Sequence, residues 1–424
     1  MKTRFLSNAY LLTALFLSCH VLQVYSQEDE GGNYYSVSGV VKDSRLKRTV
    51  EYVNVSAVGT NIGTVTNKDG EFTLKISDTL NVREIRFSRI GFYNAQVSIA
   101  KSDLKPNVYY LTPESYNLSE VQVFSWHNPR DLVREAIDKV EVNYPLKPNM
   151  LTGFYRETIQ KRRNYINISE AVIEIYKSGY DNPVGRDQVR VLKGRKLISP
   201  KKADTLSVKF IGGPNMPVFL DMVKNPDLLL DRESLHLYSF SMGEAVSIDD
   251  RLQFVVNFEP QMIVSYPLYA GTLYIDRETL SFTRAEFGMD VKDKRKVTDV
   301  ILRDKPAGLR FTPEEVSYII TYKQQDGKAY LNYIRNEIRF KCDWKRRLFA
   351  TSYTVIGEAV MTDRTDRQVS RIPNRETFSV RHSLGQEVAL YQDENFWRSY
   401  NIIEPTESLE NAVNKLKKQQ LKSQ

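Results

Sequence analysis

The chain contains little cysteine and little histidine, with 2 Cys and 4 His among its 424 residues. Two cysteines cannot form the disulfide framework that stabilises many small secreted domains. Four histidines are a small supply of the residue that most often binds metals or carries protons in catalysis. The composition therefore argues against a disulfide-rich scaffold and against a histidine-based active site.

The sequence also lacks the short motifs of common enzyme classes. His-Glu-x-x-His, Cys-x-x-Cys, Gly-x-Ser-x-Gly, the P-loop and Gly-x-Gly-x-x-Gly are absent. Zinc carboxypeptidases need His-x-x-Glu and a distant His, because catalytic zinc takes three protein ligands and keeps one position open. None of His127, His236 and His382 has Glu three residues later. We therefore expect no enzymatic activity, carboxypeptidase activity least of all, no cofactor, and no catalytic, cofactor-binding or metal-ligating residue.

Long apolar runs are scarce as well. Beyond the N-terminus, the longest uncharged stretch runs from Pro260 to Ile275 and is interrupted by Pro267 and Gly271. A helix needs about 20 apolar residues to span a bilayer. We therefore expect no transmembrane helix once the N-terminal segment is removed.

Aromatic and charged residues are abundant instead. The chain has 25 Tyr and 19 Phe, 26% charged residues and a net charge of +8. This composition is typical of a folded protein and, at about 100–200 residues per domain, predicts two or three domains. Because Tyr and Phe are enriched in strands, a mainly β protein is expected.

Residues 1–26 have the plan of a secretory signal peptide. Lys2 and Arg4 precede an apolar stretch at 11–17, and small residues lead up to a cleavage site after Ser26. The alternative is a lipoprotein in which Cys19 is lipidated. Both interpretations predict that the chain is exported.

Residues 37–112 contain short alternating segments separated by turn residues. The clearest segment is 71–76, whose apolar residues share one face. Asn, Asp and Gly cluster at 61–63 and 67–70, where such residues favour turns. Six or seven strands at this spacing predict a β-sandwich.

This region resembles the carboxypeptidase regulatory-like domain. The resemblance rests on Ser38 to Val41, on Tyr52 to Val55, and on Gly59 to Leu74, which follows the pattern Gly-Thr-x-x-Gly-Thr-x-Thr-x-x-Asp-Gly-x-Phe. The sequence departs from the family at Arg45 to Val50. The resemblance implies a transthyretin-like β-sandwich, an interaction module found at the N-terminus of TonB-dependent receptors and related envelope proteins. It also implies a location in the periplasm or at the outer membrane of a Gram-negative bacterium.

Residues 113–149 are interpreted as a linker strand followed by an amphipathic helix. The stretch from Leu118 to Val123 resembles the TonB box of receptors, and the alternative is a last strand of the sandwich or of the linker. Asn128 is a candidate N-cap, with Pro129 at the first helical position. Apolar residues then follow helical spacing, so we expect this helix to cover a sheet.

Residues 150–395 are predicted to form an antiparallel β-rich domain of unknown function. Strand alternation is clear at 330–344, which follows the hairpin turn at 325–328. Its even-numbered residues, with Cys342 among them, form the predicted buried face. The region resembles uncharacterised envelope proteins, and the hairpin at 271–276 is similar to the curved sheets of lipoprotein carriers of the LolA/LolB type.

The fold class is therefore mainly β. A transthyretin-like β-sandwich precedes an α+β domain with a large antiparallel curved sheet and few helices. Residues 396–424 form a C-terminal helical basic tail, in which Leu409, Ala412 and Leu416 follow helical spacing. We expect this helix to pack on the body of the protein, and the alternative is a helix that binds a partner.

Three features that could carry function are interpreted as structural. The run from Arg186 to Lys202 has seven basic residues and one acidic residue and is predicted to be a solvated strand edge; the alternative is a site for an anionic headgroup or acidic glycan. Asp249 and Asp250 are predicted to form a turn, because adjacent strand residues cannot face one sugar together. Trp126, Trp344 and Trp397 are predicted to be core or rim residues.

Two functions from different classes remain. The first is a non-catalytic exported envelope protein that uses its sandwich as an interaction module beside outer-membrane uptake or assembly systems. The second is a periplasmic carrier or binder that holds a lipid or glycan on the curved sheet. An unrecognised hydrolase is a weaker third. The expected partner is an envelope protein or an apolar or anionic envelope ligand, with peripheral outer-membrane association and no nucleic acid.

Overall fold

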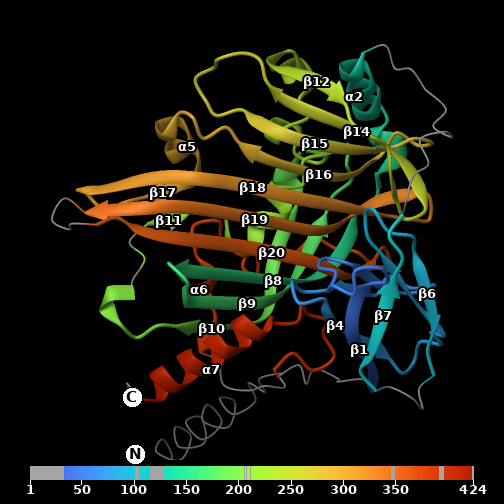
Figure 1. The fold of residues 1–424 in the computed structure, drawn as a ribbon, viewed down its shortest axis with the longest axis horizontal. Coiled ribbons are helices and arrows are strands. Elements are labelled where there is room, and N and C mark those ends of the chain that lie inside the picture. The colour runs from blue at the N-terminus through green and yellow to red at the C-terminus, as the bar shows by residue number, and fades with distance from the viewer. Residues whose placement is uncertain are drawn as a thin grey trace, which may run out of the picture.

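The computed structural model describes residues 33–100, 105–114, 128–204, 206, 208–210, 212–344, 349–390 and 396–422. The signal segment with Cys19, the stretch from Leu118 to Val123, and Trp126 lie outside these residues. The fold is mainly β, as predicted, with a small sandwich beside a large curved sheet (Figure 1).

The N-terminal strands form a sandwich of two sheets. Their bounds are β1 (Tyr34–Asp43), β2 (Asn54–Ala57), β3 (Gly63–Val65), β4 (Glu71–Ser77), β5 (Glu84–Ser88), β6 (Ala95–Ser98) and β7 (Asn107–Leu111). One sheet has the order β4-β1-β7 and the other β3-β2-β5-β6. Alternating residues of β1 and β4 are buried between the sheets, as their sequence pattern predicts. The alternation does not predict β3, because a strand of three residues is too short to show it.

The second sheet has twelve strands. Their bounds are β8 (Asn149–Lys161), β9 (Asn164–Lys177), β10 (Gln188–Ile198), β12 (Tyr238–Met242), β13 (Val246–Ile248), β14 (Arg251–Pro260), β15 (Tyr269–Asp276), β16 (Phe282–Met289), β18 (Leu309–Gln325), β19 (Lys328–Trp344), β20 (Thr351–Thr365) and β21 (Ala389–Leu390). The order is β12-β14-β15-β16-β18-β19-β20-β8-β9-β10-β21, and β13 also pairs with β14. All long strands pair antiparallel, and the short β21 pairs parallel with β10. A separate two-stranded sheet joins β11 (Lys209–Phe210) to β17 (Leu302–Asp304).

The helices are few and mostly short. They are α2 (Pro129–Asp138), α3 (Val140–Asn143), α4 (Met216–Phe219), α5 (Lys294–Ile301), α6 (Leu384–Glu387) and α7 (Glu407–Leu421). Asn128 caps α2 by accepting a hydrogen bond from the Arg130 amide, as predicted, whereas the predicted helix is broken at Lys139 into α2 and α3. Within the described part of the chain, no helix combines the length and apolar character needed to cross a membrane.

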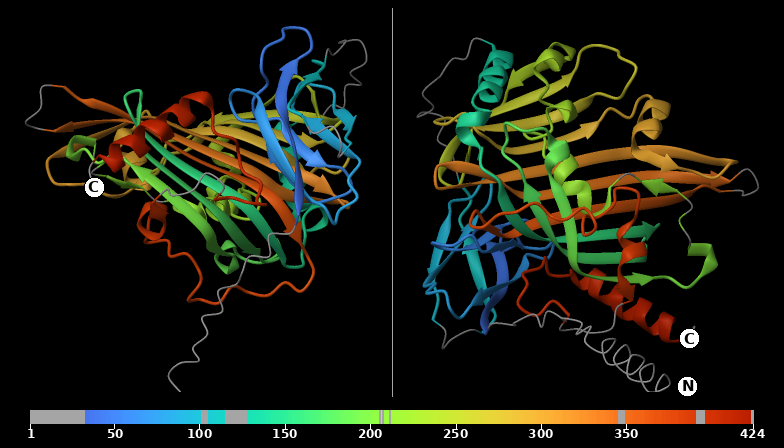
Figure 2. Two further views of the ribbon diagram at one scale, coloured as in Figure 1. Left: turned by 90° about the horizontal axis from the view of Figure 1, so that it is seen from below. Right: turned by 180° about the vertical axis from the view of Figure 1, so that it is seen from behind.

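The two faces of the large sheet have different coverings. The inner face packs against α2 and residues 202–237, which contribute Met216, Met222 and Leu235 to the main hydrophobic core. The outer face packs against the sandwich and against residues 396–406, which we call the strap (Figure 2). The helix α7 continues from the strap and packs on β9 and β10 through Leu409 and Leu416, as predicted for a helix on the body.

One predicted strand face is wrong over part of its length. In β19 the even-numbered residues from Ile334 to Cys342 are mostly buried against the inner core, as predicted. Before that point the buried inner residues are the odd-numbered Ala329 and Leu331. The cause is a β-bulge, because Tyr322 of β18 pairs with Leu331 whereas Thr321 pairs with Tyr333. The extra residue, Asn332, shifts the alternation by one position.

Candidate functional site

Five neighbouring strands carry a row of alternating charges across the outer face of the large sheet. The strand register places side chains opposite one another in the order Arg335, Glu358, Arg156, Glu170 and Arg195, on β19, β20, β8, β9 and β10. Each carboxylate of this charge ladder lies between two guanidinium groups. The Glu170 oxygens lie 2.8 Å from Nε of Arg156 and 2.8 Å from Nε of Arg195. Opposite charges on directly paired residues fix the register of neighbouring strands.

The strap lies over this charge ladder. Nη2 of Arg156 donates a hydrogen bond to the carbonyl of Ile403 at 2.7 Å. The Trp397 ring centroid lies 4.7 Å from the guanidinium carbon of Arg195, within the range of a cation–π contact. The strap therefore screens the charge ladder from water and accepts a hydrogen bond from the Arg156 guanidinium group.

The strap also binds the sandwich. The Thr64 hydroxyl of β3 donates to the carbonyl of Ile402 at 2.9 Å. The Asn401 side chain accepts from the Lys75 amide at 2.7 Å and donates to the Lys75 carbonyl at 3.0 Å, which satisfies the backbone of β4 there. The strap thus joins the sandwich to the outer face of the sheet.

A polar groove of about 660 Å³ lies between the strap, the sandwich and the outer face. A cleft with several carboxylates is what a hydrolase would need. However, Glu337 is paired with Arg335 at 2.9 Å and with Arg339 at 2.7 Å. Burial acts to raise the pKa of Glu337, but the two arginines outweigh it and lower that pKa, so this carboxylate stays charged. Burial raises the pKa of Glu404, although this group is hydrogen-bonded to the sandwich. Glu337 is therefore held by arginines of its own strand, and Glu404 contributes to the contact between the strap and the sandwich.

A second cavity, of about 430 Å³, lies on the inner face. Its floor consists of residues from β8, β9, β10, β19 and β20, and its roof includes residues 206, 208, 210, 212, 213, 216, 380–383 and 386. About half of the side chains that line it are apolar: Ile159, Ile166, Ile198, Leu206, Val208, Phe210, Met216, Ile338, Val355 and Val380. We call this space the inner cavity.

The polar residues of the cavity floor are sequence neighbours of the charge-ladder residues on the same strands. Their side chains therefore lie on the opposite face of the sheet. The register places Asn336, Gly357, Glu157 and Ser169 in one row. Gly357 leaves a gap in this row, because a Cβ atom there would lie 2.5 Å from Oδ1 of Asn336 and 3.0 Å from the sulfur of Met216. The gap leaves Asn336 and Glu157 facing the cavity without a side chain between them.

Both groups have unused capacity to accept hydrogen bonds. The Tyr155 hydroxyl donates to Glu157 at 3.2 Å, and burial raises the pKa of the Glu157 carboxyl despite this bond. The Asn336 Oδ1 atom is buried and has no hydrogen-bond partner. Buried acceptors without donors are costly and rare in native structures. The inner cavity therefore suits a ligand with an apolar body and at least one hydrogen-bond donor.

Some polar side chains of the cavity roof have partners close by in the chain. Nδ1 of His382 lies 2.6 Å from Glu387, and the hydroxyl of Ser383 donates to Gln386 at 3.2 Å. Over the residues that the structure describes, no three His, Cys, Asp or Glu side chains are grouped so as to hold a metal ion.

The basic run from Arg186 to Lys202 is only partly a solvated edge. Arg195 is 9% exposed and belongs to the charge ladder, so the prediction of solvation is wrong for it. Arg190 is paired with Glu174 on β9, and Nζ of Lys196 donates to the carbonyl of Gly385. The cross-strand register causes this difference, since it places Arg195 opposite a buried carboxylate.

Other sequence predictions are confirmed. Asp249 and Asp250 form the turn between β13 and β14, with φ angles of 53° and 60°. Trp397 is 3% exposed in the core under the strap, and Trp344 is half-buried at the edge of the inner core. Cys342 is buried, and burial raises the pKa of its thiol to about 11.

The sequence analysis did not single out Glu157 or Asn336. One signal was present, because adjacent Arg156 and Glu157 must point to opposite faces of a strand. In a sheet covered on both faces, such a pair places a guanidinium group on one buried side and a carboxylate on the other. The sequence alone does not reveal that both faces are covered.

Comparison with known proteins confirms the N-terminal module. Residues 37–123 match the family model of the CarboxypepD_reg-like domain. The search of curated proteins returned no match.

Three solved structures share weak similarity with the chain. A DUF1329 family protein from Desulfovibrio piger is 12% identical, with 57% of this chain and 93% of that chain covered and a TM-score of 0.22. A domain named for outer-membrane lipoprotein sorting, from Vibrio parahaemolyticus, is 9% identical, with 57% and 94% covered and a TM-score of 0.23. A protein of unknown function from Bacteroides fragilis, named as membrane-associated, is 7% identical, with 78% and 99% covered and a TM-score of 0.15.

Proposed function

We propose that this protein is a non-catalytic, exported envelope protein that binds an amphipathic envelope ligand in its inner cavity. Of the two functions that the sequence leaves open, the carrier or binder has the better geometric support. Export rests on the signal-like residues 1–26, and the envelope context rests on the regulatory-like module at 37–123.

The inner cavity is the observation that carries the proposal. Its volume of about 430 Å³ lies within the range of about 300–1,000 Å³ that is typical of small-molecule sites. Ile159, Ile338 and Val355 present apolar surface from three adjacent strands, and Phe210 and Met216 face them from the covering segment. An apolar chain held between these walls gains about 25 cal/mol for each Å² removed from water.

The polar groups define the other end of the ligand. Glu157 and Asn336 offer acceptors, so a hydroxyl or amine of the ligand would complete their hydrogen bonding. An ionised phosphate would meet the Glu157 carboxylate and be disfavoured there. The proposed ligand is therefore apolar along its length and carries a donor group at the buried polar end.

Native mass spectrometry of the protein, purified gently from the cell envelope, tests this proposal. We expect a bound small molecule that organic solvent extracts and that contains an acyl or other apolar chain together with a hydroxyl or amine. A spectrum of the bare polypeptide under conditions that preserve the fold would overturn the proposal.

Two variants make the test specific to the cavity. Ile159→Trp places a larger side chain on the cavity floor, and we expect it to remove the bound mass. Leu252→Trp adds the same side chain at an exposed position of β14 and should retain the ligand. Circular dichroism of both variants shows whether the fold is kept.

A second function is favoured by an edge of the sandwich. Strand β7 is an edge strand, and its Val108 and Tyr110 are 40% and 48% exposed. An exposed edge can accept an added strand from a partner protein. Cross-linking in envelope membranes through a photoreactive residue at Val108 tests this function, and a defined protein adduct would support an interaction module.

A further inference from the structure

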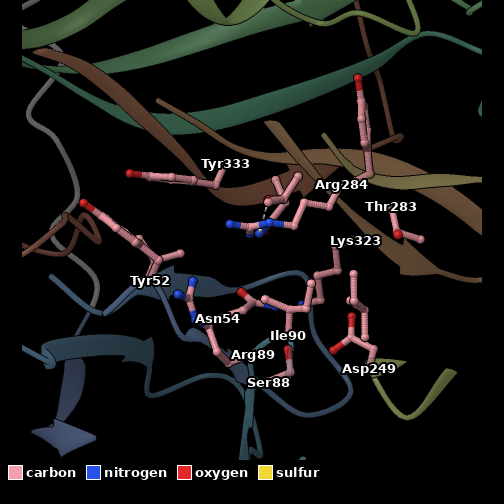
Figure 3. Close-up of a pocket in the computed structure, with 15 residues that line it drawn as sticks. Tyr52, Asn54, Ser88, Arg89, Ile90, Asp249, Thr283, Arg284, Lys323 and Tyr333 are labelled. Carbon is pink, nitrogen blue, oxygen red and sulfur yellow. Dashed lines mark hydrogen bonds between the residues drawn. The ribbon is translucent and has the colours of Figure 1, made fainter. Parts of the chain in front are cut away.

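A small cavity of about 50 Å³ lies where the sandwich meets the outer face of the large sheet. Figure 3 shows side chains from both domains pointing into it. Tyr52, Asn54 and Arg89 come from the sandwich, and Arg284 and Lys323 come from β16 and β18. It is separate from the inner cavity, which lies on the opposite face of the same sheet.

Positive charge dominates the lining of this interface cavity. Arg89, Arg284 and Lys323 are the basic residues of the lining, and Asp249 is the acidic one. Nε of Arg284 lies 2.5 Å from Glu286, which is not part of the lining. The lining itself therefore has two positive charges in excess, and Glu286 partly compensates Arg284 from outside it.

The hydrogen-bonding capacity of these cations is not fully used. Nη1 of Arg89 is buried and has no hydrogen-bond partner, although the guanidinium carbon lies 5.9 Å from the Tyr52 ring centroid. Burial lowers the pKa of Arg89, and the nearby Arg284 lowers it further. Arg284 is 8% exposed, so a second guanidinium group is held away from bulk water beside the first. Arg89 itself is half-buried, and its buried Nη1 donor beside a second guanidinium group is left without a partner.

We propose that the interface cavity binds a small oxyanion, with the chemistry of a phosphate group, between Arg89 and Arg284. Guanidinium groups bind phosphate oxygens through charge-assisted hydrogen bonds. The cavity has room for such a group, since about 10–15 Å³ of comparable volume holds one water molecule. The oxyanion bridges the domains, because Arg89 belongs to the sandwich and Arg284 to the sheet.

Anion binding would therefore stabilise the contact between the domains. Without the anion, Arg89 and Arg284 repel each other across the interface. With the anion present, Arg89 gains a partner and Arg284 gains one in addition to Glu286, so the docked arrangement is favoured. This effect is independent of any ligand in the inner cavity.

Isothermal titration and thermal unfolding of the full chain in chloride buffer of constant ionic strength test the proposal. The probes are inorganic phosphate and glycerol 1-phosphate. We expect saturable phosphate binding and a higher unfolding midpoint in phosphate. Binding of phosphate alone identifies a free anion as the occupant, and binding of both probes identifies the phosphate group of a larger molecule.

Variants decide whether this site is responsible. We expect Arg89→Gln to weaken phosphate binding at least about tenfold, the effect of losing one charge-assisted hydrogen bond. Without phosphate, Arg89→Gln should be no less stable than the parent, because it removes a buried donor that has no hydrogen-bond partner. The matched control is Arg83→Gln, an exposed position just before β5, which should bind phosphate like the parent.

Lys323→Gln provides a second test should Arg89→Gln disturb the domain contact. We expect it to weaken phosphate binding, because it removes one of the two excess charges. The absence of a phosphate effect on the parent would overturn the proposal. Equal phosphate effects in the parent and in both cavity variants would overturn it as well.

Discussion

Replacement of Glu170 by Gln tests the charge ladder on the outer face. Glu170 is 4% exposed, and Arg156 and Arg195 beside it are 3% and 9% exposed. Removal of one partner from a buried ion pair costs about 3–5 kcal/mol, because the remaining charge stays buried without compensation. Here two arginines lose their shared carboxylate, and the amide oxygen of Gln still accepts one hydrogen bond. We therefore expect a loss of about 3 kcal/mol in the free energy of unfolding.

The control for this prediction lies on the same strand. Glu174 is paired with Arg190 at 2.5 Å, but the two side chains are 20% and 32% exposed. Exposed pairs contribute about 0–1 kcal/mol, so Glu174→Gln should cost far less than Glu170→Gln. Urea denaturation at pH 7.5, followed by tryptophan fluorescence, measures both. Equal losses for the two variants would refute the argument that burial decides the size of the effect.

The pH dependence gives a further check on Glu170. Burial acts to raise its pKa, but Arg156 and Arg195 outweigh burial and lower it. A carboxyl group with a lowered pKa in the folded state adds stability above its unfolded pKa of about 4.3 and loses it as the pH falls through the folded pKa. The stability advantage of the parent over Glu170→Gln should therefore be constant from pH 6 to pH 8, because this range lies about two units or more above the unfolded pKa. The advantage should shrink in acid.

Three further predictions concern other sites. Glu157→Gln should raise the unfolding midpoint at pH 7.5, because burial disfavours the charged form of Glu157. This gain should disappear as the pH falls through the raised pKa of Glu157, and thermal unfolding at a series of pH values measures it. Cys342 should react with a thiol reagent at pH 8 only after unfolding, because its pKa is about 11 and it is buried; fast labelling of the native protein would contradict this. Ile263 is 96% exposed beside the basic helix α5, so Ile263→Ser should reduce flotation with anionic liposomes without lowering stability; unchanged flotation would argue against a membrane contact there.

Local patterns predict much of this fold. Asn128 and Pro129 mark the start of α2, because capping depends on neighbouring residues alone. The turn at Asp326 and Gly327 is equally local, and both residues have the positive φ angles that such turns require. The sandwich follows from its motif and its alternation together.

Long-range register is what the sequence does not reveal. Glu358 faces Arg156 from a strand 202 residues later in the chain, so no spacing rule links them. The bulge at Asn332 is hidden for a similar reason, because alternation predicts two faces but does not tell where one residue is inserted. Glu157 and Asn336 come together through the same register, which explains why the inner cavity cannot be derived from the sequence.

The strap has a consequence for the order in which the protein is assembled. Every chain is synthesised with its N-terminus first, and the strands of the sandwich end at Leu111. The bond between Lys75 and Asn401, however, joins residues that are 326 positions apart. The bonds from the strap to the sandwich can therefore form only after almost the entire chain has been made. The strap is then the closing step of maturation, and a chain that stalls before residue 396 leaves the two domains without this joint.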